Sequence, residues 1–263
     1  MSRWPSFHIT RRFLRVWQRD LVVYQKIWKV NLLTPVFEPL LYLLAFGVGL
    51  GGLVGKIFYQ QREVPYIEFI APALLAVNIM YNAFFENTYA SFVRMYYQKT
   101  FDAMLATPLS LEEVIAGEIL WGATKAVIAT VIMQAVISLF GLIHYPHGLL
   151  IIPVAFLGGL TFGALGMFCT GLTPSIDMFN LPIFLLITPM FLFGGTFFPI
   201  DHLPAWAQKL SLLFPLTHLV DCIRQLSFGL IQPGILWNLA VLTILFVVFF
   251  PLALITMHRR LIR

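Results

Sequence analysis

The sequence predicts an all-α polytopic membrane protein with six transmembrane helices. Three observations lead to this prediction. Hydrophobic residues make up 59% of the chain and charged residues only 11%, whereas a soluble domain carries about 25% charged residues. The apolar residues gather in six runs, each near the roughly 20 residues that a helix needs to cross a bilayer. Lysine and arginine gather mainly at the two ends of the chain, as they do in the cytosolic segments of membrane proteins.

Residues 1–29 form the first predicted region, a cytosolic tail followed by an amphipathic helix over residues 11–29. At about 100° per residue, the basic side chains of this helix share one arc and the apolar side chains share the opposite arc. The basic residues are Arg11, Arg12, Arg15, Arg19, Lys26 and Lys29, and the apolar residues are Phe13, Leu14, Trp17, Leu21, Tyr24 and Trp28. This pattern is typical of an interfacial helix that lies in the headgroup plane. A nucleic-acid-binding helix is the alternative, which is disfavoured because the apolar face continues directly into a membrane span.

Residues 30–263 form the predicted six-span transmembrane domain. The expected spans are Val30–Gly52, Ile67–Tyr89, Val114–Phe140, Leu149–Gly171, Leu181–Phe198 and Leu236–Met257. Seven lysines and arginines precede the first span, but only Lys56 and Arg62 follow in the first loop, so the positive-inside rule places the N-terminus in the cytosol. Six spans return the basic C-terminus to the cytosol as well. This topology places residues 90–113 and 172–180 in the cytosol and residues 53–66, 141–148 and 199–235 outside.

The outer segment 199–235 is too long for a hairpin and too apolar for a free loop. Pro204 can begin one short helix and Pro215 a second one. The second helix carries an apolar stripe at helical spacing, made of Leu216, Leu219, Val220, Ile223 and Leu226. We therefore expect a re-entrant helix pair between spans five and six, with its polar groups buried against protein. A full seventh span over residues 205–230 is the alternative.

No motif for catalysis or nucleotide binding is complete in the sequence. The stretch Gly49–Lys56 resembles a Walker A loop, but Leu50 replaces the first glycine and Ile57 replaces the serine or threonine. His144 and His147 lie three residues apart without a further ligand nearby, which favours an interfacial pair over a zinc site. We therefore predict a non-enzymatic chain with no metal or cofactor of its own, which takes any energy of ATP from a partner subunit.

Four charged residues within the predicted spans are candidates for a substrate pathway. Glu38, Glu86 and Glu118 lie in the inner-leaflet halves of the first three spans, and Lys125 lies deeper in the third. Charged residues within spans are rare and usually face the protein interior or a water-filled cavity. They are either polar contacts between helices or the lining of an inner vestibule that admits the headgroup of an amphiphilic substrate.

The predicted fifth span contains several residues that interrupt helices. Pro182, Pro189, Gly194 and Gly195 lie within or beside this one short span, which favours a broken or hinged helix. Gly194 and Gly195 are then a candidate gate in the substrate pathway, or a kink that admits the re-entrant helices.

The predicted cytosolic loop 90–113 is long enough to hold a short helix. Ser110 and Glu113 match a capping box, which would begin the helix of the third span. A short helix between residues 98 and 107 with exposed apolar side chains would fit a groove on another protein, whereas the alternative is a plain surface connector. The candidate coupling residues are Lys99, Phe101, Asp102, Met104, Leu105 and Pro108.

Five motifs carry a resemblance to a known family: Glu38-Pro39, residues 103–110 (Ala-Met-Leu-Ala-Thr-Pro-Leu-Ser), Val114–Glu118, residues 194–204 and Pro215–His218 with Arg224. The chain resembles the membrane permeases of ABC type-2 exporters, most of all the NodJ subgroup of nodulation-factor exporters. The resemblance implies a permease homodimer that binds two copies of a NodI-like ATPase, which holds ATP and Mg. It also implies that the loop between spans two and three carries the coupling helix.

The resemblance further implies a permease of the bacterial inner (plasma) membrane that moves amphiphiles outward. Substrates in such a family include lipo-oligosaccharides, lipids, glycans and drug-like compounds. Two alternatives belong to other classes of protein. An ion-coupled secondary transporter would show inverted repeats, and a membrane enzyme acting on lipid intermediates would show a convergent acid–base or metal constellation; neither pattern is evident in the sequence.

Overall fold

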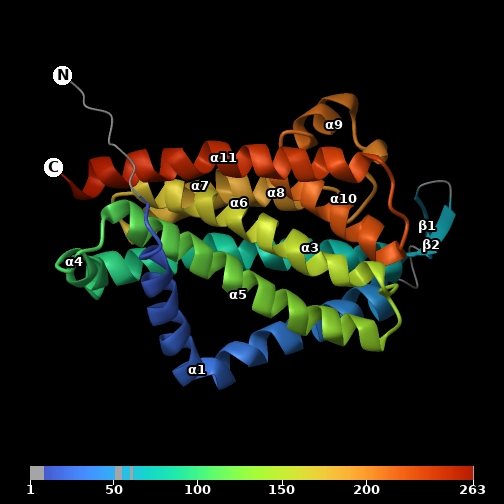
Figure 1. Cartoon of the computed structure of the whole chain (residues 1–263). Helices are drawn as coiled ribbons and strands as arrows, with labels where there is room; N and C mark the ends of the chain where they lie inside the picture. The colour runs from blue at the N-terminus through green and yellow to red at the C-terminus, as the bar shows by residue number, and fades with distance from the viewer. Residues whose placement is uncertain (1–8, 51–54, 60–61, 263) are drawn as a thin grey trace.

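The computed structural model describes residues 9–50, 55–59 and 62–262, which form a bundle of long helices with a small β-hairpin at one end (Figure 1). The longer helices are α1 (Phe13–Tyr42), α3 (Tyr66–Phe85), α5 (Leu111–Leu139), α6 (Ile151–Leu172), α10 (Pro215–Phe228) and α11 (Gly234–Leu261). The shorter helices are η1 (Leu43–Leu50), η2 (Glu86–Ala90), η3 (Val93–Tyr97), α4 (Thr100–Leu105), η4 (His147–Leu150), η5 (Ile176–Phe179), α7 (Asn180–Pro182), η6 (Ile183–Ile187), α8 (Thr188–Phe193), η7 (Ile200–His202) and α9 (Ala205–Ser211). Strands β1 (Lys56–Tyr59) and β2 (Arg62–Pro65) pair antiparallel, with Lys56 opposite Pro65.

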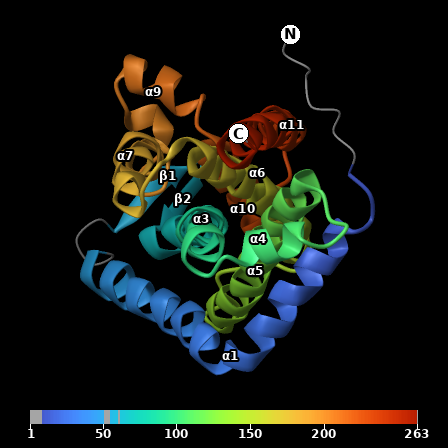
Figure 2. The ribbon, with the colours of Figure 1, turned by 90° about the vertical axis from the view of Figure 1, so that its left-hand side faces the viewer.

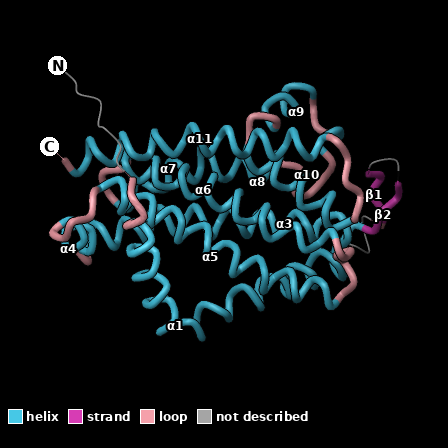
Figure 3. Tube along the Cα trace, in the orientation of Figure 1, coloured by secondary structure: helices cyan, strands magenta, loops and turns pink. Residues whose placement is uncertain are grey.

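Loops lie mainly at the two ends of the bundle (Figure 3). We call the end that carries α4 and the C-terminus the α4 end, and the opposite end, which carries β1 and β2, the hairpin end (Figure 1). The hairpin was not predicted, because neither strand shows an alternating apolar pattern long enough to identify it.

Five helices of the described residues are long and apolar enough to cross a membrane. They are Tyr66–Tyr97, Leu111–Leu139, His147–Leu172, Ile176–Phe193 and Gly234–Leu261, and they correspond to the predicted spans two to six. This confirms an all-α polytopic membrane protein. The predicted first span falls in the second half of α1 and in η1, where most side chains lie outside the described part of the chain. The count of six therefore stays a prediction.

Helix α1 bends sharply at Ile27, whose backbone leaves helical geometry (φ −118°, ψ 15°). In Figure 1 the part before the bend crosses the direction of the other helices, and the part after it turns toward that direction; Figure 2 shows that this second part still runs obliquely to the bundle. This is the arrangement expected of an interfacial helix followed by a span. The first part is fixed to α5, since Val16 is buried and Trp17 Nε1 donates a hydrogen bond to Thr124 Oγ1 at 2.9 Å.

Helix α6 packs against α3, α5 and α11 and joins them into one core. Small residues permit the close approach, as is common between membrane helices. A Cβ atom on Gly159 would lie 2.8 Å from Ala123 Cα, and one on Gly166 would lie 2.8 Å from the carbonyl oxygen of Phe84. Side chains at these two positions would push the helices apart.

The ends of two predicted spans differ clearly from the structure. The helix of the second span continues through η2 and η3 to Tyr97 rather than ending at Tyr89, so residues 90–97 of the predicted loop are helical. We call this continuous helix, Tyr66–Tyr97, the α3 helix. The fifth span ends at Phe193 rather than at Phe198, and Gly195 leads the chain out with a φ of +74°. Gly194 and Gly195 therefore end this helix instead of bending it.

The expected helix pair between the last two spans is present. Helix α9 follows Pro204, and α10 begins at Pro215. The predicted apolar stripe of α10 is buried in the core, with all five residues at most 1% exposed. Whether the pair enters the membrane stays a prediction.

Candidate functional site

The short helix α4 lies at the extreme end of the bundle (Figures 1 and 2). The chain reverses at Lys99, which adopts a left-handed conformation with a φ of 54° that side chains other than glycine rarely take. Helix α4 follows directly, and Asp102 lies on its exposed side. Tyr96 and Tyr97, which precede the turn, are 55% and 63% exposed. The sharp reversal holds α4 as a separate element beyond the spans.

The connection from α4 to α5 is held by the capping box that the sequence predicts. Glu113 N donates to Ser110 Oγ at 3.2 Å, and Ser110 N donates to Glu113 Oε2 at 3.0 Å. Glu113 Oε1 also accepts from the backbone N of Thr10 at 3.1 Å and from its hydroxyl. Arg12 adds a bond from Nη1 to the carbonyl oxygen of Pro108 at 2.7 Å. The segment that precedes α1 is thus hydrogen-bonded to the connection between α4 and α5.

The expectation that Phe101 is exposed is wrong. Its side chain is completely buried, in a cluster that includes Val16 of α1 and Val114 of α5. Met104 and Leu105 are half-buried against the same cluster. A six-residue helix has no rotational preference of its own, so packing against α1 and α5 decides which side faces inward. The exposed residues of this region are Lys99, Asp102, Ala103, Ala106, Thr107 and Pro108.

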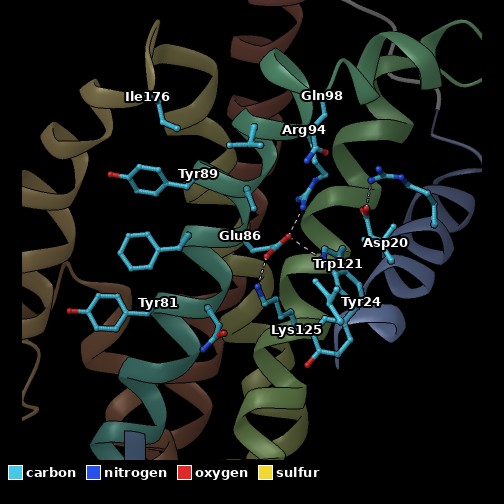
Figure 4. A pocket seen from close by; sticks show the side chains of 17 residues that line it. Asp20, Tyr24, Tyr81, Glu86, Tyr89, Arg94, Gln98, Trp121, Lys125 and Ile176 are labelled. Atoms are coloured by element: carbon cyan, nitrogen blue, oxygen red, sulfur yellow. Dashed lines mark hydrogen bonds and ion pairs between the residues drawn. The ribbon is translucent and has the colours of Figure 1, made fainter. Parts of the chain in front are cut away.

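A buried cluster of charges links the α3 helix to α5 (Figure 4). Arg94 Nη1 bonds to Glu86 Oε1 at 2.7 Å, and Arg94 Nη2 bonds to Glu118 Oε2 at 2.6 Å. Lys125 Nζ bonds to Glu86 Oε2 at 2.7 Å. The side chains of Glu86 and Glu118 are 4% and 0% exposed, so these ion pairs are shielded from solvent and depend on correct geometry.

Neutral donors complete this cluster. Ser91 Oγ donates to Glu118 Oε2 at 2.5 Å, and Trp121 Nε1 donates to Glu86 Oε1 at 3.2 Å. Both carboxylates therefore have several partners. The predicted charged residues Glu86 and Lys125 pair directly, and Arg94, which the prediction left out, joins Glu86 to Glu118.

Asp20 of α1 adds a third carboxylate beside this cluster (Figure 4). It is 4% exposed, and its Oδ1 accepts a 2.6 Å bond from Arg19 Nη1. Burial, with a smaller contribution from the charge of Glu118, raises the pKa of Asp20 to about 7, although Arg94 and Arg19 act in the opposite direction. Asp20 thus changes its charge near neutral pH.

A cavity of about 660 Å³ lies between α1, the α3 helix and α5. Figure 4 shows Glu86 pointing between Arg94 and Lys125, while Tyr81 and Tyr89 point to the opposite side of the same helix. The residues that line the cavity nevertheless combine charges with aromatic rings. The charged lining residues are Arg19, Asp20, Glu86, Arg94 and Lys125, and the aromatic ones are Tyr24, Tyr81, Phe85, Tyr89 and Trp121.

Of the other predicted pathway residues, two can be located in the structure and one cannot. The backbone of Glu38 lies in α1, but its side chain is outside the described part of the chain. Gly194 and Gly195 follow α8 and do not line the cavity; Gly195 instead accepts a 2.9 Å hydrogen bond from Arg224 Nη2 of α10. No group of three or more potential metal ligands is found among the described residues.

Arg94 and Asp20 are the residues that the sequence analysis missed. Arg94 lies eight residues after Glu86, about two helical turns, so a longer second span would have placed both on one face. Asp20 is the only acidic residue of the strongly basic stretch 11–29, and at helical spacing it falls near Phe13 and Tyr24 on the apolar side. An acidic residue on the apolar side of the predicted helix is the signal that could have identified Asp20.

Comparisons with known proteins identify relatives over almost the whole chain. Residues 11–228 match the family described as ABC-2 type transporter. Nodulation protein J of Rhizobium leguminosarum bv. viciae is 36% identical, over 95% of each chain, and Nodulation protein J of Rhizobium leguminosarum bv. trifolii is 37% identical, over 95% of this chain and 94% of the relative. The inner membrane transport permease YadH of Escherichia coli K12 is 25% identical, over 89% of this chain and 90% of the relative.

Proposed function

This chain belongs to the ABC-2 type transporter family and is a membrane permease subunit of an ABC exporter, and from this premise we propose that a separate ATPase docks on α4 and drives it. The observation that carries the proposal is the position of α4. It lies at the end of the bundle with an exposed outer side, while Phe101 is buried with residues of α1 and α5. A push on α4 would therefore reach both helices through packed side chains.

In this proposal the coupling residues have two roles. Lys99, Asp102 and Pro108 face the ATPase, since all three are exposed. Phe101 transmits the movement, and the half-buried Met104 and Leu105 serve both roles. ATP and Mg bind to the ATPase, and this chain contributes neither a cofactor site nor a catalytic residue.

Two exposed alanines offer a direct test of docking. Ala103 and Ala106 lie on the exposed side of this region, and Ala205 at the start of α9 is also exposed. Ala103→Arg and Ala106→Arg should prevent co-purification with the ATPase and remove stimulation of its ATP hydrolysis, because a bulky charge blocks close contact. Ala205→Arg is the matched control and should behave as the wild type. Retention of the ATPase by both α4 variants would reject docking at this site.

We further propose that the α4 end faces the cytosol of a bacterial inner membrane and that two copies of the chain form the permease. The basic residues of the first part of α1 support this orientation. An Ala103→Cys variant should react with a membrane-impermeant maleimide in inside-out vesicles but not in intact cells. The two native cysteines, Cys169 and Cys222, are buried and should react little. Labelling only in intact cells would invert the topology.

The proposed substrate is an amphiphile that passes the cavity between α1, the α3 helix and α5. The mixture of charged and aromatic lining residues supports this class, because an amphiphile needs both polar and apolar contacts. Glu86→Gln and Glu38→Gln should then reduce export while leaving membrane insertion intact. Transport in proteoliposomes without any ATPase would instead support an ion-coupled transporter.

A further inference from the structure

One buried carboxylate oxygen beside the cavity lacks a hydrogen-bond donor. Asp20 lines the cavity and its side chain is 3% exposed. Its Oδ1 is paired with Arg19, but none of the described residues donates a hydrogen bond to its Oδ2. Buried polar atoms in proteins are nearly always paired. The unpaired oxygen therefore points to a donor that comes from outside the chain.

Two cations of the same cavity have donors to spare, and the third does not. Lys125 Nζ has three N–H groups; one bonds to Glu86, and the side chain is 30% exposed. The guanidinium of Arg19 has five; one bonds to Asp20, and the side chain is 36% exposed. In contrast, the three nitrogens of Arg94 are all engaged within the buried cluster. An anionic group can therefore bind at Lys125 or at Arg19 without breaking the cluster.

The charges around the cavity cancel. The cations are Arg19, Arg94 and Lys125, and the anions are Asp20, Glu86 and, behind Arg94, Glu118. A ligand with a net charge would leave one charge of the site uncompensated in a partly desolvated setting, which is unfavourable. A ligand that carries one positive and one negative group matches both the free donors and the unpaired acceptor.

We propose that this cavity binds the headgroup of a zwitterionic amphiphile that carries a phosphate and a primary ammonium. The ammonium donates to Asp20 Oδ2, and the phosphate accepts from Lys125 Nζ. The acyl chains lie along Val23 and Ile27 of α1, which line the cavity and are 45% and 53% exposed. The inference rests on the proposed function, in which an amphiphile reaches this cavity.

The ammonium must be primary, because a quaternary ammonium has no N–H group for Asp20. This gives the proposal a sharp test with the purified full chain in detergent at pH 8, where the Asp20 carboxyl is ionised. Dihexanoyl phosphatidylethanolamine, dihexanoyl phosphatidylcholine and free phosphoethanolamine are titrated in turn by isothermal calorimetry. We expect the phosphatidylethanolamine to bind about tenfold more tightly than the phosphatidylcholine, the difference of one charge-assisted hydrogen bond. Free phosphoethanolamine should bind more weakly than its lipid.

Variants separate the two halves of the headgroup. Asp20→Asn should remove the preference for phosphatidylethanolamine, and Lys125→Gln should weaken both lipids to a similar extent. Asp201→Asn and Lys209→Gln are matched controls, because both residues are exposed and neither lines this cavity. The thermal unfolding midpoint of each variant shows whether it is folded. In a folded variant, a change in lipid binding can be assigned to the group that Asp20→Asn or Lys125→Gln removes.

The results that would overturn the inference are equal affinity for the two lipids, or an undiminished preference in Asp20→Asn. Free phosphoethanolamine binding as tightly as its lipid would reject the contact of the acyl chains with Val23 and Ile27, and hence a membrane amphiphile as the ligand. Co-purification of the ATPase is measured on the same preparations. Lipid preference without a bound ATPase would reject the proposed function alone, and a bound ATPase without lipid preference would reject this inference alone.

Discussion

Two buried polar networks lie toward opposite ends of the bundle, and they hold their charges in different ways. Toward the α4 end, the guanidinium of Arg94 is paired with the carboxylates of Glu86 and Glu118. Toward the hairpin end, the guanidinium of Arg224 is also buried, at 3% exposure, but it donates to backbone carbonyl oxygens. The first network depends on opposite charges, and the second depends on the fixed dipoles of the main chain.

The hairpin-end network joins α10 to three other parts of the chain. Arg224 Nε donates to the carbonyl oxygen of Phe69 at 3.2 Å, and Nη2 donates to that of Gly195 at 2.9 Å. The guanidinium also lies 3.8 Å from the centre of the Phe69 ring, a cation–π contact. Asp221 accepts a 2.6 Å bond from Asn238 Nδ2 of α11. Helix α10 is thus fixed to α3, to the segment after α8 and to α11.

This difference separates a network that can change from one that cannot. An ion pair responds to a charge that is added or removed nearby, because charges interact over several ångströms. The backbone carbonyl oxygens around Arg224 are neutral and fixed in position by the main chain. We therefore expect changes near the α4 end to affect ligand binding and pH dependence, and changes near the hairpin end to affect stability alone.

Replacement of Arg94 should have the largest effect on stability. Arg94→Met leaves Glu118 buried without its cation, and breaking a buried pair in this way destabilises by about 3–5 kcal/mol. Addition of Glu118→Gln should recover at least half of the loss, because it removes the unpaired charge. Thermal unfolding in detergent measures both variants. A double variant no more stable than Arg94→Met would show that the Arg94–Glu118 pairing does not determine the stability of this network.

Removal of the Asp20 charge should stabilise the protein in a pH-dependent way. The charged groups that act on Asp20 are Glu118, Arg94 and Arg19, and burial raises its pKa from 3.8 to about 7. Between these values the folded state binds a proton that the unfolded state releases, so stability falls as the pH rises from 4 to 7. About three pK units correspond to about 4 kcal/mol. Asp20→Asn should therefore match the wild type at pH 4 and exceed it in stability at pH 8 by up to about this amount.

The measurement is the unfolding midpoint of both proteins in detergent across this pH range. Asp201→Asn, in which an exposed carboxylate is replaced, should follow the wild type throughout. A constant difference between Asp20→Asn and the wild type from pH 4 to pH 8 would contradict a buried carboxyl that titrates near neutrality.

Replacement of Arg224 should have a smaller effect that no second change relieves. Arg224→Met removes two hydrogen bonds to carbonyl oxygens and a contact with the Phe69 ring, which together are worth about 2–3 kcal/mol. The carbonyl oxygens and the ring left behind are neutral, and Asp221 keeps its own donors Tyr59, Gln225 and Asn238, so Asp221→Asn should add its own loss rather than restore stability. Double-variant unfolding experiments test this. Rescue by Asp221→Asn would place this network in the same class as the one near the α4 end.

The features that the sequence predicted correctly are those set by residues close together in the chain. The capping box of Ser110 and Glu113 spans three residues, and Pro204 and Pro215 act on the helices that directly follow them. Each apolar run likewise lies within one helix and predicts that helix from neighbouring residues. Local chemistry of this kind can be inferred without knowledge of the tertiary structure.

The features that were missed depend on contacts between distant segments. Arg94 meets Glu118 only because the α3 helix continues eight residues beyond Tyr89, and Arg224 meets a carbonyl oxygen 155 residues away. The inward position of Phe101 is likewise decided by α1 and α5. The sequence analysis placed it outward because it lies on a short helix in a predicted cytosolic loop, and the sequence of such a loop does not show which helices pack against it.

The exposed pair of Lys99 and Asp102 should show the smallest effect, and it measures what burial adds to an ion pair at the same end of the bundle. Its charged atoms are 3.8 Å apart, and the side chains are 65% and 62% exposed. Water and salt screen such a pair, so Asp102→Asn should change the free energy of unfolding by less than about 0.5 kcal/mol. High salt should leave even this difference smaller. A loss close to that of Arg94→Met would mean that the position on the bundle, rather than burial, determines the strength of these pairs; a small loss together with weakened ATPase binding would assign the pair to docking.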